Sequence, residues 1–90
     1  VHNETSTGMT LDLARIRAIL DETGHPALLL ADTISSLGSI EFRMDEWGVD
    51  AAVGGSQKGL MLPVGFSFSV ASEKALEAHR RSTLPKHYFN

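Results

Sequence analysis

The apolar run ALLLA at residues 27–31, followed directly by Asp32, decides how this chain is expected to fold. A short, unbroken apolar run that ends at a polar residue is typical of a strand buried on both faces, as in parallel sheets. A second run of this kind covers residues 49–53 and leads through Gly54-Gly55 to Ser56-Gln57-Lys58. We expect both runs to be strands, with the second strand broken at the two glycines.

Helices are predicted on either side of these strands. Residues 11–23 place apolar side chains at helical spacing, with Thr10 as the N-cap and Gly24 as the stop signal. Phenylalanine and valine alternate with serine over residues 66–70, which is the period of a third strand. Ser72 is then expected to cap a helix that runs to about Arg81. This order of elements predicts an α/β fold with a mostly parallel sheet covered by helices.

Composition narrows the possible functions. The chain has 90 residues, a net charge of -3 and no cysteine. We therefore expect no disulfide framework, no thiolate metal site and no nucleic-acid partner. The longest apolar run is far too short to cross a bilayer, so no membrane partner and an intracellular location are expected. The chain opens without methionine on a polar stretch and ends on Tyr88-Phe89-Asn90, so we expect a segment of a longer protein.

Asp32 and Lys58 are the residues that most clearly suggest chemistry, because each follows a predicted buried strand. Ligands of open α/β sheets bind beyond the carboxyl ends of the strands. If the two strands are neighbours, the carboxylate and the amine can face opposite ends of one small ring. In the alternative reading, Lys58 is a surface residue and Asp32 a turn residue of a small binding or scaffold domain. The four histidines have no metal-ligand spacing, and the residue order of a P-loop is absent.

Three stretches resemble one known enzyme family and occur in that family's order. They are HNETSTG at residues 2–8, LLLADTISSLG at residues 28–38 and VDAAVGGSQKGLMLPVGFS at residues 49–67. The last resembles the lysine signature of class V aminotransferases, and the other two resemble the family's cofactor loop and aspartate strand. Within that class, the chain looks most like serine–glyoxylate and alanine–glyoxylate aminotransferases. Cysteine desulfurases of the class usually have histidine at the position of Gln57, which argues against desulfurase chemistry.

The resemblance implies a cofactor, pyridoxal 5′-phosphate, and a role for each matching residue. Lys58 matches the lysine that forms the Schiff base with the cofactor, and Asp32 matches the partner of its pyridine nitrogen. Thr5 matches a hydroxyl that bonds the cofactor near its ring, Ile34 an aliphatic residue on one ring face, and Gln57 a polar contact near the phosphate. No metal is implied.

The resemblance also implies an architecture and a set of partners. Residues 1–90 would be part of the large domain of a fold-type-I enzyme, with the N-terminal part and the small C-terminal domain outside this sequence. The substrates would be an amino acid, serine or alanine, and the 2-oxo acid glyoxylate. The enzyme would be a homodimer with sites at the subunit interface, cytoplasmic or, in a eukaryote, peroxisomal. Another class V reaction, with a different amino donor or oxo acid or a lyase activity, stays open.

Overall fold

A computed structural model describes residues 1–86, so the aromatic residues at positions 88 and 89 lie outside the described part. The chain begins with a short hairpin, in which β1 (Asn3–Glu4) pairs antiparallel with β2 (Met9–Thr10). Sequence reasoning predicted only a loop here. The hairpin is extended by the Leu11 amide, which donates to the His2 carbonyl at 2.8 Å.

Helix α1 (Leu13–Glu22) begins two residues later than predicted. Thr10 is not its N-cap, because Thr10 pairs with Asn3 in the hairpin and the backbone there is extended. Asp12 is the N-cap instead, and its carboxylate accepts a hydrogen bond from the Arg15 amide at 2.9 Å. The predicted stop is confirmed, since Gly24 follows the last turn with a φ of +63°, which glycine adopts without strain.

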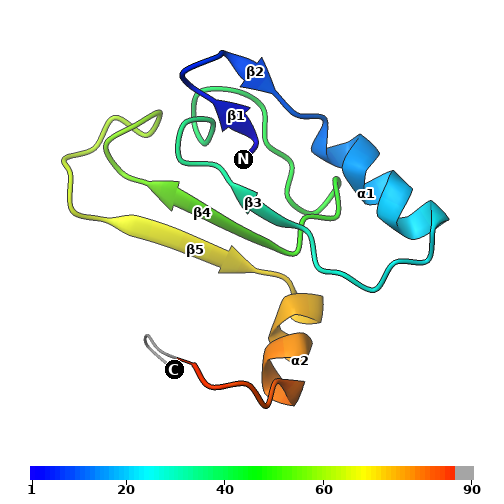
Figure 1. Ribbon diagram of the computed structural model, residues 1–90. Helices are drawn as coiled ribbons and strands as arrows, with labels where there is room; N and C mark the ends of the chain where they lie inside the picture. The colour runs from blue at the N-terminus through cyan, green and yellow to red at the C-terminus, as the bar shows by residue number, and fades with distance from the viewer. Residues whose placement is uncertain (87–90) are drawn as a thin grey trace.

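Three strands form the main sheet in the order β3 (Leu30–Asp32), β4 (Ala51–Gly55) and β5 (Ser67–Ala71). Strands β3 and β4 run parallel, whereas β4 and β5 run antiparallel (Figure 1). The prediction of a mostly parallel sheet is therefore wrong for β5. Residues 56–66 join β4 to β5 without a helix, and a parallel connection needs a longer crossover.

The two glycines at positions 54 and 55 continue β4 and do not break it. Gly54 pairs with Phe68 and Gly55 pairs with Ser67. Hydrogen bonding to β5 thus outweighs the weak strand preference of glycine. As a result, β4 extends two residues closer to Lys58 than the sequence predicted.

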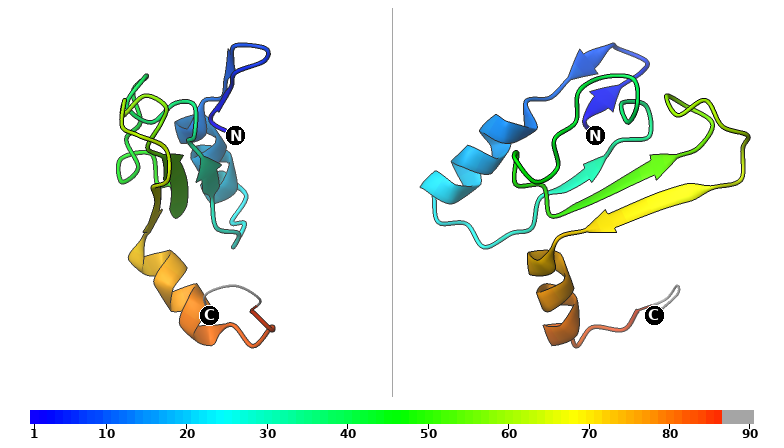
Figure 2. Two further views of the ribbon diagram at one scale, coloured as in Figure 1. Left: turned by 90° about the vertical axis from the view of Figure 1, so that its left-hand side faces the viewer. Right: turned by 180° about the vertical axis from the view of Figure 1, so that it is seen from behind.

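Helix α2 (Glu73–Arg81) has the predicted position and the predicted cap. The Ser72 hydroxyl accepts from the Ala75 amide at 3.1 Å. This helix extends from the end of β5 away from the strands, and none of its residues is buried (Figures 1 and 2). The predicted architecture required this helix to cover the sheet, and it does not.

Among residues 1–86, the core lies on one face of the sheet. Residues of α1, β3 and β4 meet there with the segment that carries Phe42 and Trp47. On the opposite face Leu30 is 66% exposed and Val53 is 44% exposed, so the predicted burial on both faces is wrong for the described residues. The solvent-accessible surface area of the chain is 6543 Å², whereas a compact monomer of its mass exposes about 5,100 Å², so the chain buries less surface than a compact domain does. The buried apolar residues of the core are Leu13, Leu29, Ala31, Val49 and Ala52.

Candidate functional site

Asp32 and Lys58 lie at the same edge of the sheet, as the sequence predicted. Asp32 is the last residue of β3 and is in register with Val53 of the parallel strand β4. Lys58 follows β4 in the next loop. Because neighbouring parallel strands end at one edge, the carboxylate and the amine reach the same region of the molecule.

Both residues line one hollow with a volume of about 180 Å³. Thr5 and Ile34 line it as well, so four of the five predicted site residues come together from three separate segments. Gln57 does not line the hollow; its side chain is exposed and lies against Gly55 of the strand. The hollow is completed by residues that sequence reasoning did not single out, namely Val1, Asn3, Glu4 and Ser35.

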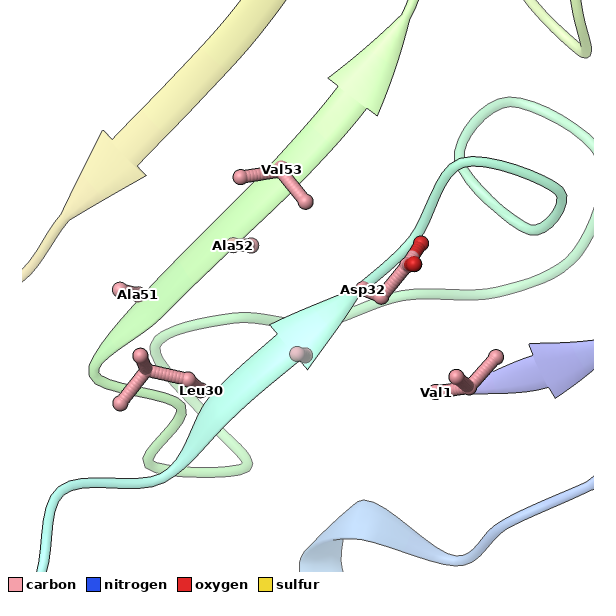
Figure 3. Close-up of a pocket in the computed structure, with 7 residues that line it drawn as sticks. Val1, Leu30, Asp32, Ala51, Ala52 and Val53 are labelled. Carbon is pink, nitrogen blue, oxygen red and sulfur yellow. The ribbon is translucent and has the colours of Figure 1, made fainter. Parts of the chain in front are cut away.

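Asp32 is held by the turn that it makes with the residues that follow. One carboxylate oxygen accepts a hydrogen bond from the Ile34 amide at 2.9 Å. The Thr33 amide and hydroxyl both donate to the Val53 carbonyl, at 3.0 and 2.7 Å. These bonds fix the end of β3 against β4, while the Asp32 side chain stays exposed at the end of the strand (Figure 3).

A buried serine closes the loop that carries Lys58. Ser56 is fully buried, its hydroxyl donates to the Pro63 carbonyl at 2.6 Å, and it accepts from the Phe66 amide at 3.3 Å. The Lys58 side chain itself is exposed, and within residues 1–86 it takes part in none of the ion pairs. The amine is therefore available to react, on a loop whose two ends are fixed.

The loops after β3 and β4 touch backbone to backbone near the hollow. Gly38 has a φ of +80°, and a Cβ there would lie 3.0 Å from the carbonyl carbon of Gly59. A Cβ on Gly59 would in turn collide with the Leu37 carbonyl. The approach fixes Asp32 and Lys58 relative to each other, and the glycines beside the two motifs were its only signal in the sequence.

The hairpin brings Thr5 to the hollow because its first residues bond to the segment after β3. The His2 amide donates to the Asp32 carbonyl at 2.9 Å, and the Ser35 hydroxyl donates to the Asn3 carbonyl at 2.6 Å. Asn3, Glu4 and Ser35 line the hollow for the same reason. Each lies inside one of the two stretches that resemble the family's cofactor loop and aspartate strand, and this position was the signal that could have identified them.

Two pKa values in this region are shifted. Burial lowers the pKa of His2 below its usual value. Hydrogen bonds from the Ser6 amide and then from its hydroxyl lower the pKa of Glu4. Neutral imidazole and ionised carboxylate are thus the forms that the fold favours at these two positions.

A larger hollow of about 340 Å³ adjoins the first on the open face of the sheet (Figure 3). Asp32 belongs to both hollows, but the rest of the larger one is lined by aliphatic side chains. It therefore offers apolar surface and no further reactive group. Its lining residues are Val1, Leu30, Ala31, Asp32, Ala51, Ala52 and Val53.

Neither a metal-binding cluster nor a membrane-spanning helix is found in the described part of the chain. Among residues 1–86, no three or more histidine, aspartate or glutamate side chains gather in a group that could hold a metal ion. Within the same residues, neither helix has the length and apolar character that a membrane span requires.

Comparison with known proteins places the chain in a family. Residues 1–86 match the family described as aminotransferase class-V. The chain is 55% identical to an L-aspartate–glyoxylate aminotransferase of Paracoccus denitrificans, over 99% of this chain and 22% of that protein. It is 54% identical to a serine–glyoxylate aminotransferase of Arabidopsis thaliana, over 100% of this chain and 22% of that protein.

A solved structure leads to the same family. The crystal structure of an alanine–glyoxylate aminotransferase from Nostoc sp. superimposes with a TM-score of 0.82 at 41% identity. The superposition covers 92% of this chain and 22% of that one. The chain thus spans about a fifth of the length of the curated relatives it matches. With a family match over residues 1–86 and relatives of this identity, the chain belongs to the class-V aminotransferase family.

Proposed function

We propose that this chain forms the lysine and aspartate part of the active site of a pyridoxal-5′-phosphate-dependent aminotransferase that uses glyoxylate as amino acceptor. One observation carries the proposal: Lys58, Asp32, Thr5 and Ile34 line the same hollow although they come from three separate segments. The relatives' names support the acceptor, since the aspartate, serine and alanine enzymes all share glyoxylate. Serine or alanine is the proposed amino donor.

The residues around the hollow fit the cofactor on which class-V aminotransferases depend. They offer a primary amine, a carboxylate, a hydroxyl and an aliphatic side chain around one opening. When bound, pyridoxal 5′-phosphate supplies an aldehyde that combines with amines and a ring that accepts the electrons left at the substrate α-carbon. This donor set has a partner for the aldehyde and a partner for the ring nitrogen of such a molecule.

Each of these side chains has its own role in the proposed reaction. Lys58 Nζ would hold the cofactor through its aldehyde and would move the proton at the substrate α-carbon. The negative charge of Asp32 would favour a protonated ring nitrogen. Thr5 would donate a hydrogen bond to the cofactor, and Ile34 would pack against it.

The other proposed roles lie at or beyond the limits of the hollow. Gln57 is proposed to contact the phosphate from the outside, since its side chain is exposed next to Gly55. Residues 1–90 are proposed to be part of one large cofactor-binding domain, with the phosphate site and the substrate carboxylate site completed by other segments. Homodimeric assembly and a cytoplasmic or peroxisomal location stay predictions.

A second class V reaction with another amino donor is the alternative. The observation in its favour is that the relatives at 55% and 54% identity carry different donors in their names, L-aspartate and serine. Initial rates of the full-length protein with serine, alanine and aspartate against glyoxylate would rank the donors. A clear preference for aspartate would replace serine or alanine in the proposal.

The cofactor assignment is tested by trapping the covalent bond to the lysine. The full-length protein is expected to absorb at about 420 nm with bound cofactor and to lose this band on borohydride reduction. After proteolysis, the peptide that contains Lys58 should carry the added mass of the reduced cofactor. Lys58→Ala should show neither signal and no turnover, whereas Lys86→Ala is the matched control with an exposed lysine on the C-terminal side of α2. Label on another lysine, or more than a few per cent of wild-type activity in Lys58→Ala, would refute the assignment.

A further inference from the structure

Two buried polar side chains, His2 and Ser36, lie outside the set that lines the hollow and have no task in the proposed reaction. His2 is 2% exposed and Ser36 is 0% exposed. His2 Nδ1 and Ser36 Oγ are 2.9 Å apart. The imidazole also packs against Phe42 and Trp47, with ring centroids 5.7 Å away in each case. The hydrogen bond is therefore made inside an aromatic cluster.

This pair joins the two segments that bring side chains to the hollow from the hairpin and from β3. His2 directly precedes Asn3, and Ser36 directly follows Ser35, both of which line the hollow. Four hydrogen bonds cross between the segments: the His2–Ser36 bond, the Ser35 hydroxyl to the Asn3 carbonyl and to the Asn3 side-chain oxygen, and the His2 amide to the Asp32 carbonyl. Of these four, only the first is made by two side chains that are both buried.

The hairpin depends on such contacts because it has little stability of its own. Its strands are two residues long, β2 is exposed throughout, and an isolated two-stranded hairpin is marginal in water. Thr5 is exposed and sits on this hairpin, so its place beside Asp32 is set by the contacts on either side of it. Removal of the Ser36 hydroxyl would leave a buried imidazole nitrogen without its partner, and movement of the hairpin would relieve this cost.

We propose that the hydrogen bond between His2 and Ser36 positions the hairpin, so that these two residues control how tightly the enzyme holds its cofactor without touching it. The pair fixes the separation between Thr5 on one segment and Asp32 with Ile34 on the other. His2 and Ser36 are thus positioning residues. The inference rests on the proposed function, because the molecule held in the hollow is taken to be pyridoxal 5′-phosphate.

The test compares Ser36→Ala with Ser72→Ala in the full-length protein. Ser72 caps α2 and does not line the hollow. Ser72→Ala therefore also removes a serine hydroxyl and lowers stability, but in an element away from the hollow. Titration of the apoprotein with pyridoxal 5′-phosphate should give a Kd about tenfold higher for Ser36→Ala than for wild type, and an unchanged Kd for Ser72→Ala. Turnover of Ser36→Ala at saturating cofactor should stay close to that of wild type, because no reacting group is removed.

A second measurement needs no cofactor. In the apoprotein, hydrogen exchange at the Leu11 amide, which bonds to the His2 carbonyl, should be faster in Ser36→Ala and unchanged in Ser72→Ala. His2→Leu, which keeps an apolar side chain but no ring nitrogen, should behave like Ser36→Ala. His2→Asn can place a polar atom near the position of Nδ1 and should restore the Kd to within about threefold of wild type.

The outcomes separate the two proposals. A Kd for Ser36→Ala and His2→Leu within about twofold of wild type would overturn the positioning role. Equal loss of cofactor affinity in Ser36→Ala and Ser72→Ala would also overturn it, since general stability would then be the cause. If the wild-type protein itself binds no pyridoxal 5′-phosphate, the proposed function fails, while the exchange rates still report whether the pair holds the hairpin. If Ser36→Ala does not fold, the comparison of His2→Leu with His2→Asn gives the same decision.

Discussion

Replacing Asp32 by asparagine separates the charge of this side chain from its structural hydrogen bond. In the structure, one carboxylate oxygen accepts from the Ile34 amide at 2.9 Å. An asparagine side-chain oxygen can accept the same bond, so Asp32→Asn should keep the turn that places Ile34. Asp32→Ala should lose it. The side chain is exposed, so this loss should lower the free energy of unfolding by only about 0.5–1.5 kcal/mol.

The effect on the rate should be far larger and should be the same for both variants. In the proposed reaction, the carboxylate stabilises a positive charge on the cofactor ring. Unit charges at contact separation, about 4 Å, attract by about 4 kcal/mol at an effective dielectric constant of about 20. Each 1.36 kcal/mol or so of transition-state stabilisation is worth about a factor of ten in rate. Both variants should therefore lose about three orders of magnitude in kcat/KM.

The assay is the initial rate of amino transfer to glyoxylate by the full-length holoenzyme at saturating cofactor. It is combined with urea unfolding of the same preparations. The expected pattern is a similar loss of kcat/KM in Asp32→Asn and Asp32→Ala, with a loss of stability in Asp32→Ala alone. If Asp32→Asn keeps more than about a tenth of the wild-type kcat/KM, the charge is not needed and Asp32 is only a turn residue.

Three further predictions follow from burial and charge. Asp50 is 5% exposed, accepts a hydrogen bond from the Leu29 amide at 2.8 Å and forms ion pairs with two basic side chains. Asp50→Ala should therefore lower the free energy of unfolding by about 3–5 kcal/mol, and Asp50→Asn should lower it by clearly less. Equal urea midpoints for the two variants would contradict this prediction. Burial lowers the pKa of His2, so the stability that its neutral imidazole contributes is present above the unfolded-state pKa of 6.5 and is lost as the pH falls below it. The free energy of unfolding in urea should therefore fall more steeply from about pH 7.5 to about pH 5.5 for wild type than for His2→Asn. Parallel plots of this free energy against pH for the two proteins would exclude the effect. A polypeptide of residues 1–90 alone should be inactive and should self-associate, because Leu30 and Val53 expose apolar surface beside an open sheet face; a monodisperse monomer in light scattering would contradict this.

Some parts of the fold could be predicted because they depend on neighbouring residues. Ser72 caps α2 through a bond to an amide three residues away, and Gly24 ends α1 because of its own backbone freedom. The apolar runs that end at Asp32 and lead to Lys58 likewise carry their own signal, since each is short, apolar and followed by polar residues. These features identified the two main residues of the candidate site and the edge of the sheet at which they lie.

Other parts were decided only by contacts between distant segments. Gly54 and Gly55 belong to β4 because β5 pairs with them, and β5 runs antiparallel because residues 56–66 form a loop with no helix. Thr10 lies in a hairpin because Asn3 pairs with it, which leaves Asp12 to cap α1. No local pattern contains these pairings.

The sequence by itself singled out Asp32 and Lys58, and its resemblance to a known family added Thr5 and Ile34 as predicted site residues. The tertiary structure decided that these four line one hollow, that Gln57 lies outside it, and that Asn3, Glu4 and Ser35 complete it. The tertiary structure also decided which serine hydroxyls are buried and hydrogen-bonded. Ser36 and Ser56 are both fully buried, and each bonds to a residue outside its own turn. A buried polar group must find a hydrogen-bond partner, and only the folded chain determines which groups are buried.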